Sequence, residues 1–358
     1  MNIADSSNSR SSDRSRLVLA LDVHGGDFGP GVTVPAALDV LEKHAGLEIL
    51  LCGIRAEIET VLDQLKKSNR LTTAMQRLAI IDASHALAAD ARPVVALRRG
   101  KGSSLWLALE QVAEGRASAC VSAGSTAAIL ALGVKLLGLL PGIERPALMS
   151  RVPSASGHTS LLDLGANLHV SAYQLVQFAI MGSVACDMDD PTQQPSVALL
   201  NVGHEDSKGD SLIKEAHSIL RELPINYMGF IEGHDIFAGK VDVAVCDGFS
   251  GNLIIKSSEG LAEMIFQHLE MAMNSGWMGR FGRWMMGKSL KQTLARFEPS
   301  KHNGAPLLGL RGVVVKSHGN ADRAATAQAI EEAVVEAQRE VPGMIEKMIN
   351  DYSIEVGF

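Results

Sequence analysis

Glycine-containing loops hold the residues of this sequence whose types and spacing suit the binding of an anion. Backbone amides at the start of a helix form a ready site for phosphate, because the free N–H groups and the helix dipole both favour negative charge. Apolar runs lead repeatedly into such loops, which begin at His24, Ser122, Gly165, Gly203, Asp247 and Ser317. One such loop would indicate only a tight turn, whereas several on one sheet edge favour phosphate.

Two of these loops also carry a side chain that can stabilise negative charge. Lys208 lies in the loop Asn201–Gly209, and Asn252 ends the loop Asp247–Asn252. An ammonium group neutralises a phosphate or an oxyanion, and an amide N–H donates a hydrogen bond to it. We therefore expect both side chains to contact a bound anion.

The first loop combines carboxylates with a histidine. Asp22 and Asp27 flank His24-Gly25-Gly26, where a carboxylate could orient a donor or cap the next helix. Capping is the role that we expect for Asp27. His318, like His24, lies in a loop after a strand, and these two are the histidines that we expect to take part in chemistry.

Signatures of covalent and nucleotide chemistry are absent from the sequence. It contains no G-x-S-x-G elbow, no H-E-x-x-H pair and no G-x-G-x-x-G turn. Gly282–Ser289 satisfies the phosphate-loop pattern G-x-x-x-x-G-K-S, but helical sequence precedes it, so we expect no nucleotide site there. The four cysteines lie too far apart for a zinc site. We expect neither a metal nor a cofactor.

The elements that must position these loops are short strands without polar alternation, separated by helical segments. This pattern predicts a mostly parallel α/β sheet with helices on both faces, in which a ligand binds at the carboxyl ends of the strands. The final segment, Ala321–Asn350, contains Pro342-Gly343 and is expected to form two helices. The predicted strands are Leu17–Val23, Leu47–Cys52, Leu78–Asp82, Ala119–Val121, Ser160–Leu164, Val197–Val202, Val241–Cys246 and Gly312–Lys316.

The composition excludes several classes of protein. The 358 residues include 33 Lys+Arg and 40 Asp+Glu, a net charge of -7 that argues against nucleic-acid binding. Hydrophobic residues make up 46% of the chain, enough for a large core in one domain or two lobes, with Asp187–Pro195 as a possible link. Residues 1–16 predict a disordered tail before a domain at 17–350. The unpaired cysteines and the lack of a membrane span predict a cytoplasmic protein.

A helical, Met-rich segment interrupts the α/β rhythm at residues 260–301. Trp277, Phe281 and Trp284 recur at the spacing of one helix face, and basic residues are interleaved with them. Such a face fits contact with an anionic membrane or an acidic protein, or burial in a subunit interface. The expected contact residues are Trp277, Arg280, Phe281, Arg283, Trp284 and Lys288.

Taken together, the loop motifs resemble those of the PlsX-type phosphate acyltransferases of bacterial phospholipid synthesis. The resemblance covers Leu17–Ile349, and the combination of motifs is specific. The chain departs from the family at His24, where Met or a similar residue is usual, and at Ser125, where Asn is usual. The motifs include Leu19-Ala20-Leu21-Asp22-Val23-His24-Gly25-Gly26-Asp27, Ser122-Ala123-Gly124-Ser125-Thr126, Asp163-Leu164-Gly165-Ala166-Asn167, Cys246-Asp247-Gly248-Phe249-Ser250-Gly251-Asn252 and Val314-Val315-Lys316-Ser317-His318-Gly319.

The resemblance implies conversion of acyl-[acyl-carrier-protein] and inorganic phosphate to acyl phosphate and free carrier protein. It implies a homodimer with an isocitrate/isopropylmalate dehydrogenase-like fold, peripherally associated with the membrane, where a downstream membrane acyltransferase would receive the product. Lys208 and Asn252 are the expected catalytic residues. The expected phosphate and substrate-binding residues are Asp22, His24, Gly25, Gly26, Asp27, Gly124, Ser125, Thr126 and His318.

Two alternatives from other classes remain open at this point. An NAD-dependent dehydrogenase of related fold would need an Arg-rich substrate clamp and metal-binding aspartates, which the sequence does not display. A non-catalytic peripheral membrane scaffold would have no need of Lys208, Asn252 and the glycine loops. Trapping acyl phosphate with hydroxylamine distinguishes both from the acyltransferase.

Overall fold

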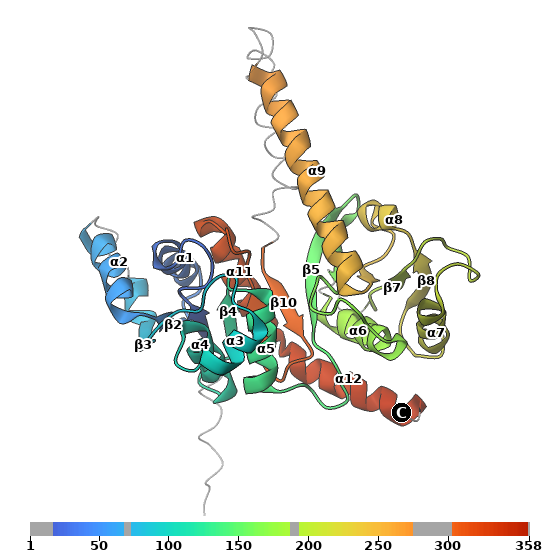
Figure 1. Cartoon of the computed structure of the whole chain (residues 1–358), viewed down its shortest axis with the longest axis horizontal. Coiled ribbons are helices and arrows are strands. Elements are labelled where there is room, and N and C mark those ends of the chain that lie inside the picture. The colour runs from blue at the N-terminus through green and yellow to red at the C-terminus, as the bar shows by residue number, and fades with distance from the viewer. Residues whose placement is uncertain (1–16, 68–72, 187–192, 275–302, 357–358) are drawn as a thin grey trace, which may run out of the picture. The chain divides into compact units, whose positions relative to one another are not determined.

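The computed structural model describes residues 17–67, 73–186, 193–274 and 303–356 (Figure 1). Its contacts divide the chain into two compact units. Unit 1 comprises Met1–Leu137 and Gly312–Glu340, and unit 2 comprises Gly138–Arg311 and Val341–Phe358. The polar segment Asp187–Pro195 therefore connects two elements within unit 2 and does not join the units.

Five parallel strands form the sheet of unit 1, in the order β3-β2-β1-β4-β11. Because all the strands are parallel, their carboxyl ends and the loops that follow them lie on the same edge. Each strand was expected from its apolar run. The bounds are β1 Leu17–Asp22, β2 Leu47–Gly53, β3 Leu78–Asp82, β4 Ala119–Ser122 and β11 Val313–Lys316.

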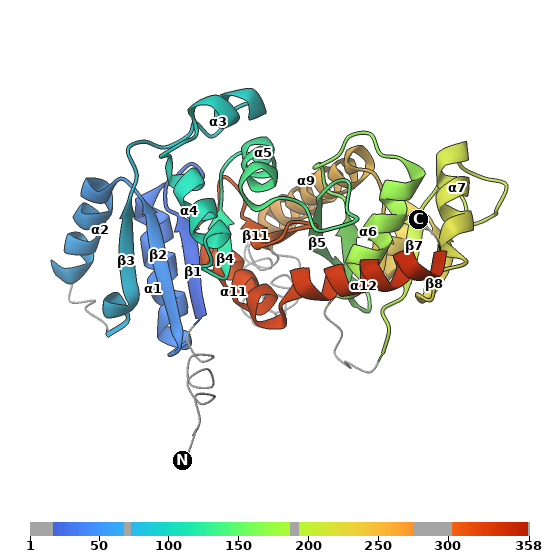
Figure 2. The same cartoon turned by 90° about the horizontal axis from the view of Figure 1, so that it is seen from below.

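Helices cover both faces of this sheet (Figure 2). On one face α1 packs against α11 over alternate β1 residues such as Leu19 and Leu21. Helix α4 contacts strands β1, β2 and β4. A bidentate ion pair between Arg323 and Asp39 also joins α1 and α11. The helices are α1 Pro30–Lys43, α2 Arg55–Lys67, α3 Pro93–Arg99, α4 Ser104–Ala113, α5 Thr126–Leu137 and α11 Arg323–Arg339, with a 3-10 helix at Thr73–Arg77.

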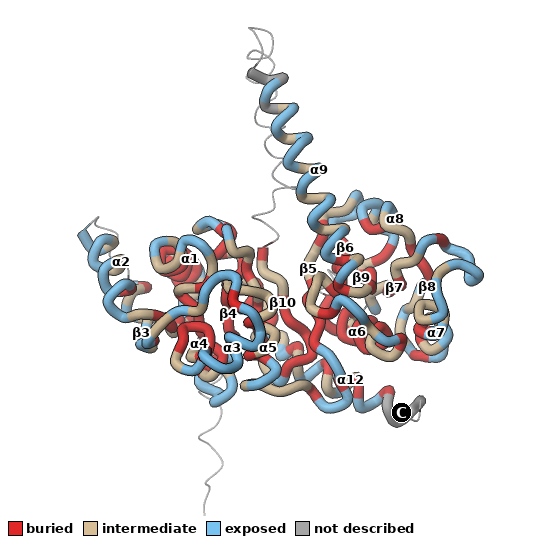
Figure 3. Tube along the Cα trace, viewed as in Figure 1, coloured by how far each residue is buried: buried red, intermediate tan, exposed pale blue. Residues whose placement is uncertain are grey.

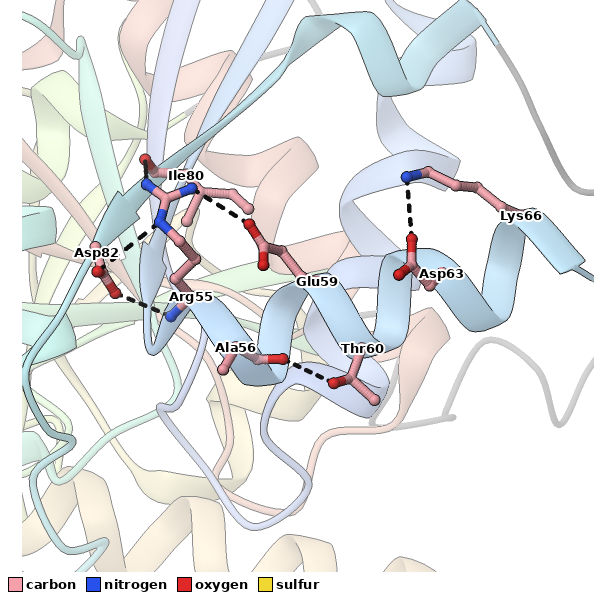
Figure 4. A network of polar contacts seen from close by, with 8 residues as sticks. All are labelled: Arg55, Ala56, Glu59, Thr60, Asp63, Lys66, Ile80 and Asp82. Carbon is pink, nitrogen blue, oxygen red and sulfur yellow. Dashed lines mark hydrogen bonds and ion pairs between the residues drawn. The ribbon is translucent and has the colours of Figure 1, made fainter.

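Polar contacts of Arg55 attach α2 to the edge strand β3 (Figure 4). The Arg55 backbone N–H donates to the Asp82 carboxylate at 3.0 Å, and its guanidinium lies 3.5 Å from Glu59. Toward the end of the same helix, Lys66 pairs with Asp63 on the exposed surface. Exposed pairs of this kind contribute little to stability, so the end of α2 suits charge substitutions used as controls.

Unit 2 contains a mixed sheet in the order β10-β5-β6-β9-β7-β8. Strand β5 pairs antiparallel with β10 and β6, whereas the pairs β6–β9, β9–β7 and β7–β8 are parallel. The sequence predicted β6, β7 and β9 but not β5, β8 or β10. The bounds are β5 Ala147–Ser154, β6 Gly157–Leu162, β7 Val197–Leu200, β8 Tyr227–Ile231, β9 Val243–Val245 and β10 Ala305–Leu308.

Two apolar clusters hold helices against this second sheet. One joins α6, α7 and α12 to residues such as Met149 and Val243, and the other joins α8 and the start of α9 to residues such as Leu161 and Ala244. As expected, the C-terminal segment forms two helices, which meet at Glu340 with a φ of 54°. The helices of unit 2 are α6 Ala172–Ala185, α7 Ser211–Leu220, α8 Gly233–Ala238, α9 Gly248–Asn274 and α12 Val341–Val356.

Helix α9 extends away from the rest of unit 2 and is largely exposed along its length (Figure 3). The helical pattern expected from Gly260 onward is confirmed as far as Asn274, and the remainder of that segment lies outside the described residues. Apolar side chains such as Leu261 and Met271 are 55% and 60% exposed. Within the described ranges, no helix is both long enough and hydrophobic enough to cross a bilayer.

Candidate active site

In unit 1 the loops that follow β1, β4 and β11 pack against one another. A β-carbon at Gly25 would lie 2.8 Å from the Ala123 nitrogen and 2.9 Å from the Ser122 hydroxyl. Gly26 has a φ of 83°, a conformation that side chains rarely adopt. The Asp27 N–H donates to the Gly319 carbonyl at 2.8 Å. The glycines are therefore required for the close approach of the three loops, while the anion binding expected of them stays a prediction.

Asp22 lies beneath these loops and acts on them through Ser122. The Gly124 N–H donates to the Ser122 hydroxyl at 3.0 Å, and that hydroxyl donates to Asp22 Oδ2 at 2.7 Å. Asp22 is only 2% exposed, and its Oδ1 has no hydrogen-bond partner among the described residues. The carboxylate thus orients the loop after β4 from behind.

Burial raises the pKa of the Asp22 carboxyl, although the Ser122 hydroxyl and the nearby polar groups of Ser104 and His24 lower it in part. Burial likewise raises the pKa of the Cys52 and Cys120 thiols, and the negative charge of Asp22 adds to this effect. These two thiols are free and stay protonated at neutral pH. They are therefore unsuited to nucleophilic catalysis.

The helices α1 and α5 begin at this edge without a carboxylate cap. Gly29 precedes α1 and no side chain caps the helix, so the capping role expected for Asp27 is wrong. A cap by Asp27 would have started α1 at Phe28. With Gly29 as the N-cap, the helix begins two residues later, at Pro30. Ser125 precedes α5, which begins at Thr126, and its hydroxyl donates to the Ala91 carbonyl at 3.2 Å. Pro30 has no N–H, and the Val32 and Thr33 N–H groups donate to the Gly29 carbonyl, so the candidate anion donors at these helix starts are the amides of Gly31 and of the first turn of α5.

The two histidines expected here have different surroundings. His24 Nε2 accepts a hydrogen bond from the Ile54 N–H at 2.9 Å, and its Nδ1 lies 3.7 Å from Glu57. The hydrogen-bonding pattern assigns the neutral ring's proton to Nδ1 and commits the ring to the connection between β2 and α2. His318 is half-buried, and its carbonyl accepts from the Ala321 N–H at 3.2 Å.

In unit 2 the loop after β7 presents Lys208. Lys208 is exposed, and its N–H donates to the Glu205 carbonyl at 2.9 Å. A β-carbon at Gly203 would lie 3.0 Å from Lys208 Cγ, so the lysine stem packs over this glycine. Gly209 closes the loop with a φ of 81°. The loop is thus a folded support for the ammonium group.

His204 anchors this loop to β8 and α8. Its Nδ1 lies 3.1 Å from the Phe230 carbonyl oxygen, and its Nε2 lies 3.2 Å from Asp235 Oδ2. Asp235 is fully buried, and hydrogen bonds, chiefly from Lys240 and the Glu232 backbone, lower its pKa despite the opposing effect of burial. Asp235 is therefore a charged fixed point. Sequence reasoning passed over His204, although it immediately follows Gly203 in the predicted loop.

Asn252 lies in the first turns of α9, at the same sheet edge, because β9 and β7 are adjacent parallel strands. A β-carbon at Gly165 would lie 3.6 Å from Asn252 Cβ, so the asparagine packs over the loop after β6. The Gly248 N–H donates to the Asn167 carbonyl at 2.8 Å and fixes the same two loops together. Asn252 is exposed.

Asp163 holds the loop after β6 in place. Its Oδ1 accepts from the N–H groups of Leu148 and Ala166, and its Oδ2 accepts from the N–H and the side-chain amide of Asn167, all between 2.6 and 3.1 Å. Burial raises the pKa of this carboxyl, and the four hydrogen bonds oppose the rise. The quoted Asp163–Asn167 motif contained Asp163, but its spacing alone did not reveal this role.

The helices after β7 and β9 carry their own caps. Asp210 accepts from the Ile213 N–H at 2.9 Å at the start of α7, and Asp247 accepts from the Ser250 N–H at 2.7 Å at the start of α9. Each carboxylate accepts from one first-turn amide and places a negative charge at the helix start, which disfavours a bound anion there. The expected contact residues Trp277, Arg280, Phe281, Arg283, Trp284 and Lys288, and the Gly282–Ser289 pattern, lie outside the described residues.

Comparisons with known proteins agree with this geometry. The phosphate acyltransferase of Shewanella sp. (strain MR-4) is 46% identical over 342 residues, which cover 95% of this chain and 98% of that protein. A phosphotransacetylase from Streptococcus pyogenes matches the structure with a TM-score of 0.59 at 18% identity, covering 90% of this chain and 94% of its own. A putative 4-hydroxythreonine-4-phosphate dehydrogenase from Salmonella typhimurium matches with a TM-score of 0.50 at 11% identity, covering 90% and 99%.

The structural likenesses confirm the predicted α/β, dehydrogenase-like fold. The sequence profile of the family described as "Fatty acid synthesis protein" matches residues 17–344, nearly the whole of the two units. Together with the identity to a phosphate acyltransferase over 95% of the chain, this match shows the family. The chain belongs to the fatty acid synthesis protein family, that of the PlsX-type phosphate acyltransferases.

Proposed function

We propose that this protein transfers the acyl group of acyl-[acyl-carrier-protein] to inorganic phosphate. The products are acyl phosphate, which feeds the synthesis of phosphatidic acid, and free carrier protein. The observation that carries the proposal is a pair of glycine-braced sheet edges, one offering uncapped helix amides and the other the exposed Lys208 and Asn252. Membership of the phosphate acyltransferase family supports the same reaction.

The chemistry needs no activated serine or cysteine, because phosphate is itself the nucleophile. A phosphoryl group with a second pKa of about 6 is mostly dianionic at neutral pH. One phosphate oxygen attacks the thioester carbonyl, a tetrahedral oxyanion forms, and its collapse expels the carrier's thiolate, which then takes up a proton. The protein must bind phosphate, align it and stabilise the oxyanion.

Within this mechanism the amides of Gly26 and Thr126 bind phosphate. The Gly25 and Gly124 N–H groups, expected to join them, instead donate to the Asp22 carbonyl and the Ser122 hydroxyl and so shape the two loops. Lys208 neutralises phosphate or the oxyanion, and Asn252 donates an amide N–H to the same centre. Lys208 suits this part because it is exposed on a folded loop. His24 serves the connection between β2 and α2, so its contribution to binding is indirect.

The proposal includes a homodimer that works in the cytoplasm at the membrane surface. The spacing of Trp277, Phe281 and Trp284 in the sequence, with basic residues between them, supports contact with anionic lipid or the carrier protein. At the membrane, a downstream acyltransferase would take up the acyl phosphate. Flotation of wild type and Trp284→Glu with anionic liposomes tests the lipid contact.

Hydroxylamine trapping tests the reaction itself. Purified protein with acyl-[acyl-carrier-protein] and phosphate should give more acyl hydroxamate than the enzyme-free reaction of the thioester with hydroxylamine, and omission of phosphate should abolish this excess. Lys208→Ala and Asn252→Ala should each lower the rate by ~10²-fold or more, as for the loss of an oxyanion donor. Lys66→Ala, which removes an exposed cation from α2, serves as the control.

Three outcomes would contradict the proposal. Near-normal rates in folded Lys208→Ala or Asn252→Ala would remove these residues from the mechanism. The absence of hydroxamate from wild type would favour a scaffold, and phosphate-independent reduction of NAD would favour a dehydrogenase.

A further inference from the structure

The short helix α3 in unit 1 exposes more apolar surface than its own packing explains. Its single buried side chain is Ala96, whereas Val94, Val95 and Leu97 are 56%, 43% and 38% exposed. Scattered apolar residues are common on protein surfaces, but three on one seven-residue helix form a patch. A patch of this kind indicates a surface that a partner covers.

Cations surround these apolar side chains. Arg92, Arg98, Arg99 and Lys101 are all exposed, and Asp90 is the only acidic residue between Ala83 and Lys101. The side chains of these four cations form no ion pair with any residue of the described ranges. On a protein with a net charge of -7, this patch offers a local positive field.

The patch is fixed next to the loop that precedes α5. The Ser125 hydroxyl donates to the Ala91 carbonyl, two residues before α3 begins. From within α5, Lys135 donates to the Leu97 carbonyl at 3.2 Å and lies 5.0 Å from the Trp106 ring centroid. Figure 2 shows α3 beyond the strand ends of unit 1, on the side of α5. The α3 patch, defined as Arg92, Val94, Val95, Leu97, Arg98, Arg99 and Lys101, thus adjoins the uncapped start of α5.

We propose that the α3 patch docks the acidic carrier protein that presents the acyl thioester, an inference that rests on the proposed function. A small apolar centre with a basic rim matches an acidic protein that also exposes apolar side chains. Attachment beside Ser125 favours this partner over a bilayer, because a donor docked there can bring its thioester to the phosphate loop. A lipid contact would require no such neighbourhood.

Charge reversal tests the docking surface in the full-length protein. Arg98→Glu/Arg99→Glu should raise the KM for acyl-[acyl-carrier-protein] by about tenfold or more at low ionic strength, through a slower association. The effect should shrink as salt approaches 0.15 M, where the screening length is about 8 Å. With a small acyl thioester such as acyl-N-acetylcysteamine, the rate should stay within about twofold of wild type. Lys66→Glu/Lys67→Glu on α2 makes the same change in net charge and should leave both rates unaltered.

Each other outcome overturns the inference. An unchanged KM for the carrier protein would remove the α3 patch from docking, while wild-type activity would leave the proposed function intact. Loss of binding to anionic vesicles with the carrier KM unchanged would assign the patch to lipid, and a changed oligomeric state would assign it to a second copy. Failure of wild type to form acyl phosphate from either donor would overturn the proposed function as well. A parallel loss of rate with the small thioester would mean that the reversal damages the site.

Discussion

The two units present different groups at the sheet edges that we propose to bind an anion. In unit 2 the helices after β7 and β9 begin with Asp210 and Asp247, whose carboxylates accept from the first-turn amides. In unit 1, α1 follows Gly29 without a side-chain cap, and the hydroxyl of Ser125 before α5 donates elsewhere. The amide of Gly31 and the first-turn amides of α5 are thus available in unit 1, since Pro30 has no N–H and the Val32 and Thr33 N–H groups donate to the Gly29 carbonyl. Unit 2 presents the side chains of Lys208 and Asn252 instead.

The buried carboxylates of the two edges, Asp163 and Asp22, differ in how many of their oxygens accept hydrogen bonds. Asp163 in unit 2 accepts four hydrogen bonds and has no spare oxygen. Asp22 in unit 1 accepts from Ser122 through Oδ2, while its Oδ1 has no hydrogen-bond partner among the described residues. A saturated carboxylate fixes a loop as part of the fold. Asp22 has one oxygen without a partner, so burying it in the charged form costs more free energy, and it holds only the loop after β4.

Asparagine substitution at these two positions should give the largest difference. In Asp163→Asn the amide NH₂ replaces an oxygen that accepts from backbone N–H groups, so two buried donors lose their acceptor. Each such loss costs about 1–3 kcal/mol, so we expect the free energy of unfolding to fall by about 3 kcal/mol. Urea denaturation measures it.

The matched variant is Asp22→Asn. Its amide oxygen can still accept from Ser122, and its NH₂ replaces the unpartnered Oδ1, so the loss should stay below about 1 kcal/mol. Equal losses in the two variants would show that the two carboxylates do not differ as described.

Gly25→Ala should break the anion site of unit 1 with a smaller free-energy effect. The new β-carbon would press on the Ala123 nitrogen and the Ser122 hydroxyl, which moves the loop that carries Gly124. We expect the KM for phosphate to rise by roughly tenfold or more, since small displacements weaken aligned contacts strongly. Steady-state kinetics with phosphate as the varied substrate checks this.

Gly343→Ala is the control, because a β-carbon at Gly343 in α12 meets no atom within 4 Å and this helix carries no residue of the proposed site. It should leave the KM for phosphate unchanged and stabilise the helix slightly. A normal KM in Gly25→Ala would show that these loops do not bind phosphate.

The pH dependence of stability should sharpen the view of Asp22. Its pKa is raised by burial above the ordinary value of 3.8, so the folded state holds this proton more tightly than the unfolded chain. The resulting stabilisation is present at low pH and is lost as pH rises from about 4 through the folded pKa. Asp22→Asn cannot lose that proton. Relative to wild type, the variant should therefore gain stability as pH increases from 4 to 7 in urea titrations, and a constant difference would contradict the raised pKa.

Much of the fold was predictable because buried parallel strands are continuous apolar runs that end in glycine. Eight strands followed from this pattern, and Pro342-Gly343 predicted two C-terminal helices, although the break lies at Glu340 and α12 includes the proline. Strand β5 was missed because Ser150, Arg151 and Pro153 interrupt its apolar run, and its partners are antiparallel. Strand β8 contains Gly229, and β10 is only four residues long, so neither differs clearly from a loop.

The candidate site was predictable where chemistry is local and not where contacts are long-range. The glycines and Lys208 could be identified from their residue types and from their positions after predicted strands. The commitment of His24 to Ile54 joins two separate loops, and no spacing in the sequence encodes it. The sequence Gly29-Pro30 indicates that α1 begins at Pro30, because proline is common at the first position of a helix. This pattern competes with a cap by Asp27.

The smallest effect should come from His204, which tests whether unit 2 depends on the placement of side chains. Both ring nitrogens of His204 face acceptors, the Phe230 carbonyl and Asp235, so the ring satisfies both only when each nitrogen carries a proton. Glutamine at this position can donate to one acceptor but cannot span both. The loop that supports Lys208 would then be held less firmly, and kcat should fall by roughly two- to fivefold. The KM for phosphate should change little, because the amides of unit 1 are untouched.

His234→Gln is the matched control, since His234 lies 3.2 Å from the same Asp235 but outside the Lys208 loop. Equal effects of the two substitutions would mean that His204 only stabilises α8, whereas a loss confined to His204→Gln would tie the anchor to the catalytic lysine.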